Sequence, residues 1–217
     1  MSEIVPTVVP VSLDDIVRVA DSCKEFADTI HIDVADGQFA PNTTWMPKAG
    51  DILPSRMRYE VHMMVANPHD MGLAYAAAGA HSLIGHAEAF KGADAAKVAF
   101  DAWKGAGITE VQTAALLHTP LEAIATYVSI SDIVLLMTIA SIGVQGIPFE
   151  EKSIARVAEF KAMHPEVRIA VDGGVSLSNI EALARAGATH FCAGSVLSKS
   201  PDLKGTYQQL HSLANGV

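Results

Sequence analysis

The sequence has few cysteines and few basic residues, and each shortage narrows the classes of protein to consider. Its two cysteines, Cys23 and Cys192, lie far apart, which predicts reduced thiols packed as small core residues in a cytoplasmic protein. Only 15 lysines and arginines stand against 24 acidic residues, giving a formal net charge of -9. This balance argues against nucleic-acid binding, which needs a basic footprint.

Long hydrophobic runs are also missing, although 50% of the 217 residues are hydrophobic. No stretch approaches the about 18 consecutive apolar residues of a membrane span, and the N-terminal residues lack the cationic region of a signal peptide. We therefore expect no membrane partner. The apolar content is sufficient for one large core, so a single domain over residues 1–217 is predicted.

Hydrophobic periodicity predicts eight strand–helix units in strict alternation. The expected strands are residues 4–9, 29–35, 58–65, 82–88, 110–117, 132–139, 167–171 and 189–193. A short helical stretch is also expected near residues 48–53. Alternation of this kind needs a parallel sheet, and eight units favour a closed (β/α)₈ barrel, the TIM-barrel form of the α/β class. An open doubly wound sheet is the alternative, but no Gly-x-Gly-x-x-Gly motif follows the first strand.

The segment TIHIDVADGQFAPN carries ionisable groups on a predicted strand. Its alternation places His31 and Asp33 on one strand face. Because an unpaired buried charge is costly, a metal ion or a reaction is their natural partner. In barrel enzymes the chemistry takes place at the carboxyl ends of the strands, where the third strand adds His62 and the seventh ends in Asp172.

Two imidazoles and two carboxylates in this arrangement predict a metal site. Such a donor set suits one divalent ion, Zn, Fe(II), Mn or Co, and does not discriminate among them. His86 and Glu88, at the end of the fourth strand, are expected beside the site, where they would orient a metal-binding histidine. Glu60 lies one step deeper, and whether it belongs to the site or pairs with a neighbour inside the barrel stays open.

Glycines at the ends of the seventh and eighth strands predict an anion site. Gly173 and Gly174 follow one strand, and Gly194 and Ser195 follow the other. Backbone N–H groups at these two loops bind phosphate in many barrels, and Ser195 can add a hydroxyl donor. Tight-turn geometry alone would also explain the glycines. The loop of residues 140–146, from Ala140 to Gly146, could fold over the ligand as a lid.

The segments HIDVADGQFAPN, VHMMVANP, HAEA, LLMT, VDGGV and AGS, taken together, resemble the ribulose-phosphate 3-epimerase family over nearly the whole chain. The resemblance implies a metal-dependent isomerase, a phosphorylated ketose as small-molecule partner and a homo-oligomer. It places the metal on His31, Asp33, His62 and Asp172. It also gives Asp33 and Asp172 the role of acid and base on opposite faces of the substrate.

The implied reaction is a 3-epimerisation of the D-ribulose 5-phosphate to D-xylulose 5-phosphate type. One aspartate removes the proton beside the ketone to give a metal-stabilised enediolate, and the other returns a proton on the opposite face. The substrate and phosphate contacts expected from the strand ends and the resemblance are Thr7, His62, Met64, Met137, Gly143, Gly146, Gly173, Gly174, Gly194 and Ser195.

Two departures from the family pattern bear on the substrate. Ala35 replaces the methionine of H-x-D-x-M-D-G, which predicts a larger pocket beside the metal, and the 140–146 loop lacks the family's proline. With these departures two alternatives stay open. The protein could run the same chemistry on another ketose phosphate (allulose 6-phosphate or a tetrulose phosphate), or it could bind a phosphosugar without catalysing a reaction. A lyase like the orotidine-monophosphate decarboxylases is disfavoured, because their D-x-K-x-x-D motif needs a lysine where Ala35 stands.

Overall fold

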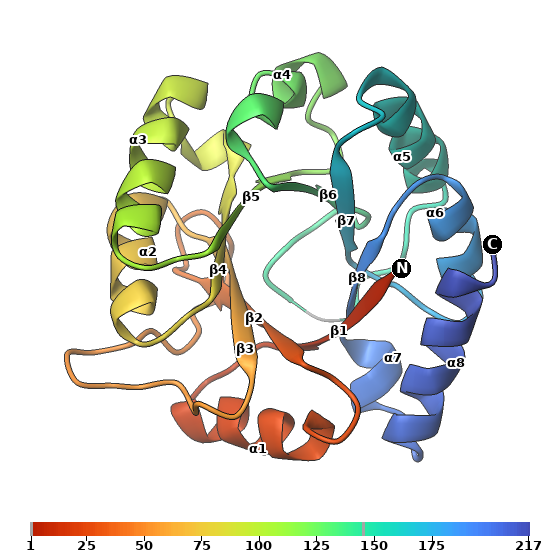
Figure 1. Ribbon diagram of the computed structural model, residues 1–217, viewed down its shortest axis with the longest axis horizontal. Coiled ribbons are helices and arrows are strands. Elements are labelled where there is room, and N and C mark those ends of the chain that lie inside the picture. Colours follow the sequence, from red (N-terminus) through yellow and green to blue (C-terminus); the bar gives the residue numbers. More distant parts are fainter. Residues whose placement is uncertain (1, 145) are drawn as a thin grey trace.

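A computed structural model describes residues 2–144 and 146–217, so Gln145 of the predicted lid loop lies outside the described residues. Eight parallel strands form a closed barrel in the order β1-β2-β3-β4-β5-β6-β7-β8. Figure 1 looks along this barrel and shows the helices as a ring around the strands. The (β/α)₈ barrel predicted from the strand–helix alternation is confirmed.

Strands and helices alternate along the chain. The strands are β1 (Glu3–Val8), β2 (Thr29–Ala35), β3 (Arg58–Met64), β4 (Ser82–His86), β5 (Glu110–Ala115), β6 (Ile133–Met137), β7 (Arg168–Asp172) and β8 (His190–Ala193). The α-helices are α1 (Leu13–Cys23), α2 (Pro68–Ala77), α3 (Ala93–Gly105), α4 (Leu121–Ala125), α5 (Lys152–Met163), α6 (Ile180–Arg185), α7 (Ser195–Ser198) and α8 (Leu203–Asn215). Two 3₁₀ turns are η1 (Ala87–Ala89) and η2 (Val128–Ile130).

Besides shifts of one or two residues at the ends of other strands, the predicted elements differ from the observed ones in three places. The expected helix near residues 48–53 is wrong: this segment has one turn at residues 49–50, where the Asp51 side chain accepts a hydrogen bond from the Lys48 N–H at 2.8 Å. The fourth strand ends at His86, because Glu88 belongs to the turn η1. The short helix α7, which begins at Ser195, was not predicted, since four residues carry no helical periodicity.

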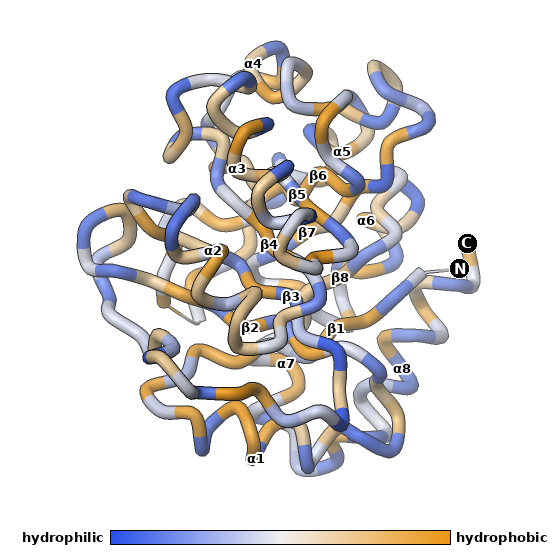
Figure 2. The backbone as a smooth tube through the Cα atoms, turned by 60° about the vertical axis from the view of Figure 1, so that its left-hand side comes forward, coloured by the Kyte–Doolittle hydropathy of each residue, from blue (hydrophilic) through white to orange (hydrophobic). Residues whose placement is uncertain are grey.

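The apolar core lies mainly between the barrel and the helices. Trp103 of α3 is fully buried there, and its indole N–H donates to the His69 carbonyl at 3.0 Å. Gly72 and Gly85 make room for this ring, because a Cβ on Gly72 would lie 2.2 Å from the indole nitrogen. Figure 2 shows hydrophobic residues recurring along the strands, with most hydrophilic stretches on the outer helices and loops.

The interior of the barrel is unusual in being polar along β2, β3 and β8. His31, Glu60, His62 and His190 are all at most 2% exposed, although each carries a titratable group. Cys192 lies among them as a free, buried thiol. Among residues 2–144 and 146–217, no helix is long and apolar enough to cross a membrane.

Candidate active site

Four of the polar side chains predicted from the strand ends meet at the carboxyl end of the barrel. His31 and Asp33 come from β2, His62 from β3 and Asp172 from the last position of β7. One donor atom from each lies within 4.8 Å of the others. The His62 Nδ1 atom is the centre of the group, 3.1 Å from Asp33 Oδ1 and 3.4 Å from Asp172 Oδ2.

The geometry around His31 fits a bound cation. Its Nδ1 atom lies 2.6 Å from Glu60 Oε1, so the ring proton belongs on Nδ1 and the lone pair on Nε2. The buried Nε2 atom makes no hydrogen bond within the described residues, yet it faces Asp33 Oδ1 at 3.3 Å. A lone pair beside a carboxylate is repulsive, and a cation between them removes the repulsion. Two imidazole nitrogens and two carboxylates are donors that Zn, Fe(II), Mn and Co accept.

The electrostatics keep Asp33 ionised. Burial alone would raise the pKa of this carboxyl, but the His31 and His62 imidazoles, when they are protonated towards it, outweigh burial and hold the pKa well below its usual range. Its side chain is 12% exposed, and that of Asp172 is 13% exposed, so both carboxylates reach the cavity while the two histidines lie beneath it.

His62, His86 and Glu88 form a chain of hydrogen bonds, in which His86 contacts His62 and Glu88 contacts His86. The Nε2 atoms of His62 and His86 are 2.8 Å apart, and His86 Nδ1 lies 3.2 Å from Glu88 Oε2. Burial raises the pKa of Glu88, but its hydrogen bonds from His86, Thr119 and the Leu116 N–H prevail and lower the pKa to about 2. Burial lowers the pKa of His86. A neutral His86 held by an ionised carboxylate can fix the ring of His62.

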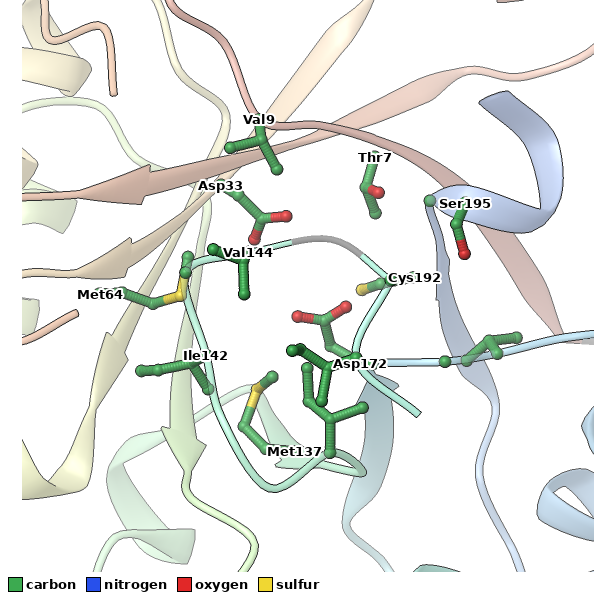
Figure 3. Close-up of a pocket in the computed structure, with 18 residues that line it drawn as sticks. Thr7, Val9, Asp33, Met64, Met137, Ile142, Val144, Asp172, Cys192 and Ser195 are labelled. Carbon is green, nitrogen blue, oxygen red and sulfur yellow. The ribbon is translucent and has the colours of Figure 1, made fainter. Parts of the chain in front are cut away.

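A cavity opens above these groups. Figure 3 shows Asp33 and Asp172 pointing into it from different sides, with Thr7, Met64, Met137 and Ser195 around them. The expected substrate contacts that line it are Thr7, Met64, Met137, Gly143, Gly146, Gly173, Gly174, Gly194 and Ser195. His62 is fully buried and is not part of the lining.

Several lining residues were missed at the sequence level. They are Val9, Ile139, Ile147, Val175 and Cys192, whereas Ile142 and Val144 line the cavity as parts of the loop that was expected to cover the ligand. Cys192 could have been found, because strand alternation from Cys192 to Gly194 puts both on the inner side of β8. Ile142 and Val144 belong to the long loop after β6, where no periodicity indicates which residues turn inward.

The loop after β6 closes the cavity from above. The Asn42 side-chain amide donates to the Gly143 carbonyl at 2.7 Å, and a Cβ on Gly143 would lie 2.9 Å from Ala40. Ile142 is only 8% exposed beneath this contact. The cavity measures about 50 Å³ as space for water-sized molecules and stays partly open to solvent.

Ala35 lies on the inner face of β2, the face that also carries His31 and Asp33. It is fully buried in an apolar cluster with Ala40, Met64 and Ile142, and it is not itself among the residues that line the cavity. An enlarged pocket beside the metal stays a prediction.

The turn after β7 depends on glycine. Gly173 has φ +111° and Gly174 has φ +68°, and Thr138 Oγ1 donates to the Gly173 carbonyl. A Cβ on Gly173 would lie 2.6 Å from the Ile139 side chain, and one on Gly174 would lie 2.9 Å from Phe149. The turn that is expected to face a phosphate is thus held in a conformation that a side chain would disturb.

Gly173→Ala is expected to destabilise the protein by about 1–3 kcal/mol, because alanine at positive φ is strained and its methyl group meets Ile139. Urea unfolding measures this change. Gly105→Ala is the matched control, since Gly105 ends helix α3 and a Cβ there would meet nothing within 4 Å. Equal unfolding midpoints for the two variants would contradict the expected strain.

Comparisons with known proteins point to one family. A model described as the ribulose-phosphate 3 epimerase family matches residues 4–198. A ribulose-phosphate 3-epimerase of Bacillus subtilis is 32% identical over 202 residues, which cover 89% of this chain and 90% of that protein. A ribulose-phosphate 3-epimerase of Rhodobacter capsulatus is 33% identical over 203 residues, covering 91% of this chain and 86% of that protein.

Solved structures add information on the fold alone. KGPDC from Streptococcus mutans has a TM-score of 0.73 at 14% identity, covering 100% of this chain and 99% of that chain. A 3-hexulose-6-phosphate synthase from Salmonella typhimurium has a TM-score of 0.69 at 14% identity, and the match covers 99% of this chain and 98% of that chain. At such low identity these two structures support the barrel and no particular reaction.

Proposed function

Because the chain belongs to the ribulose-phosphate 3-epimerase family, we propose that it interconverts D-ribulose 5-phosphate and D-xylulose 5-phosphate with one bound divalent metal. The observation that carries this proposal is the pair of carboxylates, Asp33 and Asp172. They come from β2 and β7, lie on either side of His62 Nδ1, and both face the cavity. An epimerase needs such a pair, since the proton leaves from one face of the carbon and returns to the other.

His31, Asp33, His62 and Asp172 would hold the metal, as their donor atoms lie close enough to share one ion. When bound, a divalent ion supplies Lewis-acid polarisation of the ketone and of the neighbouring hydroxyl. The chain's own contribution is to hold the donors rigidly. His62 is braced by His86, and His31 by Glu60, so both rings present a fixed nitrogen.

The two aspartates would move the protons. Each carboxylate has two oxygens, so one can face the metal while the other faces the substrate carbon. In one direction one aspartate, as the carboxylate, accepts the proton from C3, and its counterpart, as the carboxylic acid, donates its own proton to the opposite face of the same carbon. The reverse direction exchanges the two protonation states. Met64 and Met137 line the cavity beside them and would keep bulk water from the reacting carbon.

The opposite end of the cavity suits the phosphate. Gly173 and Gly174 after β7, with Gly194 and Ser195 after β8, line that end. Glycine allows close approach of an anion to the backbone, and Ser195 offers a hydroxyl. The cavity lining within the described residues contains no lysine or arginine, so backbone and hydroxyl donors are the groups available there.

Deuterium exchange tests the proposal directly. The purified enzyme in D₂O is expected to incorporate deuterium at C3 of D-ribulose 5-phosphate while D-xylulose 5-phosphate forms. The apolar residues Ile142 and Val144 in the cavity wall favour including a panel of phosphorylated ketoses, among them allulose 6-phosphate and a tetrulose phosphate. Faster deuterium exchange with one of these sugars would identify that sugar as the substrate, while the proposed epimerisation chemistry would stand. Exchange with none would support a non-catalytic sugar-phosphate binder.

Asn42→Ala is expected to raise KM for the ketose phosphate several-fold. The substitution removes the hydrogen bond that holds Gly143 in the closed loop, so the closed state loses about 0.5–1.5 kcal/mol. Steady-state kinetics measure the change. Asn67→Ala is the control, because Asn67, which precedes α2, donates to the exposed side chain of Asp70. An unchanged KM in Asn42→Ala would show that the Asn42 contact does not hold the loop during turnover.

A further inference from the structure

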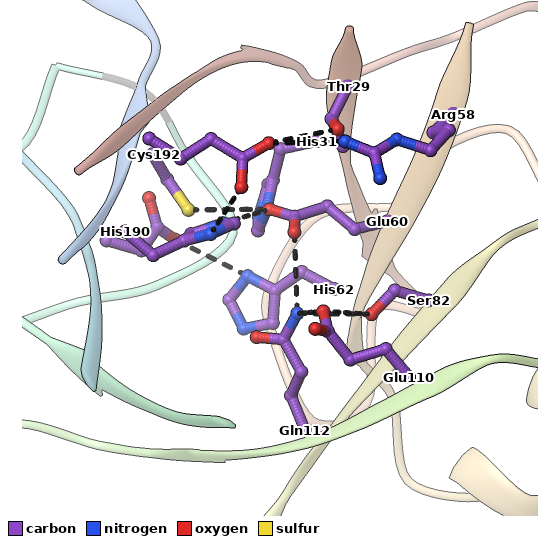
Figure 4. Close-up of polar contacts among 12 residues, drawn as sticks. Thr29, His31, Arg58, Glu60, His62, Ser82, Glu110, Gln112, His190 and Cys192 are labelled. Atoms are coloured by element: carbon purple, nitrogen blue, oxygen red, sulfur yellow. Dashed lines mark hydrogen bonds and ion pairs between the residues drawn. The ribbon is translucent and has the colours of Figure 1, made fainter. Parts of the chain in front are cut away.

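A second layer of polar side chains lies inside the barrel, directly beneath the candidate metal site. Figure 4 shows Glu60 at its centre, between His31 on one side and His190 on the other. Glu60 Oε1 lies 2.6 Å from His31 Nδ1 and 3.0 Å from His190 Nε2. Its second oxygen accepts a weaker hydrogen bond from Gln112 at 3.4 Å. The four residues come from β2, β3, β5 and β8, so the contacts span the barrel.

We propose that His190 is a positioning residue for the metal site, acting through Glu60 to fix the orientation and tautomer of His31. The inference rests on the proposed function, because it assumes that His31 Nε2 is a metal ligand. His190 itself lies too deep to touch a substrate, since it is 2% exposed and is not part of the cavity lining.

The first step of the argument is the place of Glu60. A glutamate has a long, flexible side chain, and Glu60 is 1% exposed, so protein donors alone determine where its carboxylate lies. His190 supplies the donor from the far wall of the barrel and aligns the Oε1 atom with His31. Its Oε1 atom lies within hydrogen-bonding distance of both rings, 3.0 Å from His190 Nε2 and 2.6 Å from His31 Nδ1. Glu60 is therefore an acceptor for the His31 proton.

The second step is the competing partner of His31. Cys192 Sγ lies 3.3 Å from the same Nδ1 atom, and 3.8 Å from Glu60 Oε1. A thiol is a weak donor, whereas an ionised carboxylate only accepts. With Glu60 in place, Nδ1 keeps its proton and Nε2 offers a lone pair to the metal. If Glu60 moves away, Nδ1 can accept from the thiol, the proton then resides on Nε2, and that nitrogen can no longer bind a cation.

The third step is the outer end of the network. His190 Nδ1 faces Glu3 Oε2 at 3.5 Å, and Glu3 Oε1 accepts from Thr29 at 3.1 Å. The ring of His190 lies between two carboxylates, but within the described residues its hydrogen bond is the one from Nε2 to Glu60, since Nδ1 has no hydrogen-bond partner. Through that contact a residue of β8 acts on the orientation of a ligand on β2.

The experiment is metal affinity, measured by chelator competition with Zn²⁺ and Mn²⁺ on His190→Leu and on the control His211→Leu. His211 lies on the outer helix α8, so its loss removes an imidazole without touching the barrel. We expect His190→Leu to bind metal about 10–100-fold more weakly than the wild-type protein, and His211→Leu to be unchanged. Should His190→Leu not fold, His190→Asn keeps a polar group that is too short to reach Glu60 and must show the same loss.

Two further measurements separate positioning from simple stabilisation. Nitrogen-15 NMR of the metal-free protein is expected to show His31 protonated on Nδ1 in the wild type and on Nε2 in His190→Leu. Glu60→Gln is expected to weaken metal binding, and adding His190→Leu to it should cause no further loss, because both act at one contact.

The outcomes distinguish this inference from the proposed function. A wild-type protein that binds no metal would overturn both. A wild-type protein that binds metal and epimerises, together with a folded His190→Leu of unchanged metal affinity and unchanged His31 tautomer, would overturn the role of His190 alone.

Discussion

Asp172→Asn is expected to lower the rate of epimerisation by about 10²–10⁴-fold, the usual contribution of a positioned acid or base. The side chain ends β7 and faces the cavity across from Asp33, so no other described carboxylate among the cavity-lining residues can replace it. Asparagine keeps the shape and the polar contact with His62 but cannot accept a substrate proton. A coupled assay for D-xylulose 5-phosphate measures the rate, and circular dichroism checks the fold.

Isotope washout makes this prediction specific for two bases. In Asp172→Asn, Asp33 remains, so the C3 proton of one epimer should still exchange with solvent although the two epimers no longer interconvert. Asp33→Asn should show the mirror result, with exchange from the other epimer. Asp101→Asn is the control, since Asp101 pairs with Lys97 on the exposed face of α3. Near wild-type epimerisation by Asp172→Asn would show the two-base scheme to be wrong.

The fold follows from local signals along the chain. The strand β2 has the bounds that periodicity indicates, and at the start of α1 the Asp15 side chain accepts a hydrogen bond from the Ser12 N–H. Eight such units leave a parallel barrel as the arrangement that pairs every strand. The helix expected at residues 48–53 does not form, because this short segment between Pro47 and Pro54 contains one turn and otherwise no regular structure.

The candidate metal residues could be predicted because two simple rules combine. Strand alternation places His31 beside Asp33, and barrel geometry gathers the carboxyl ends of strands from distant parts of the sequence. The layer beneath could not be predicted in the same way. The contact between Glu60 and His190 joins β3 to β8 across the barrel interior. The two side chains meet because of the register of these strands along the barrel axis, which the sequence pattern of either strand does not reveal.

Chelation of the metal is expected to remove activity entirely and to lower the melting temperature. Without a cation, Asp33 and the Nε2 lone pair of His31 face each other at 3.3 Å, and Asp172 adds a second carboxylate to the group. A metal present at 100 times its dissociation constant stabilises a folded protein by about 2.7 kcal/mol. Dialysis against a chelator, elemental analysis and differential scanning calorimetry measure the loss, and adding back Zn²⁺, Mn²⁺, Co²⁺ or Fe²⁺ in turn should restore both properties.

The same experiment separates the epimerase from a sugar-phosphate binder. A binder has no use for two bases placed around one imidazole, so it could bind D-ribulose 5-phosphate equally well with and without metal and exchange no deuterium in either state. The epimerase should lose exchange together with its metal and regain it with the ion, because the carboxylates can abstract the C3 proton only when the carbonyl is polarised. Full exchange by a protein that elemental analysis shows to be metal-free would contradict this dependence, and would leave Asp33 and Asp172 acting as bases without a metal.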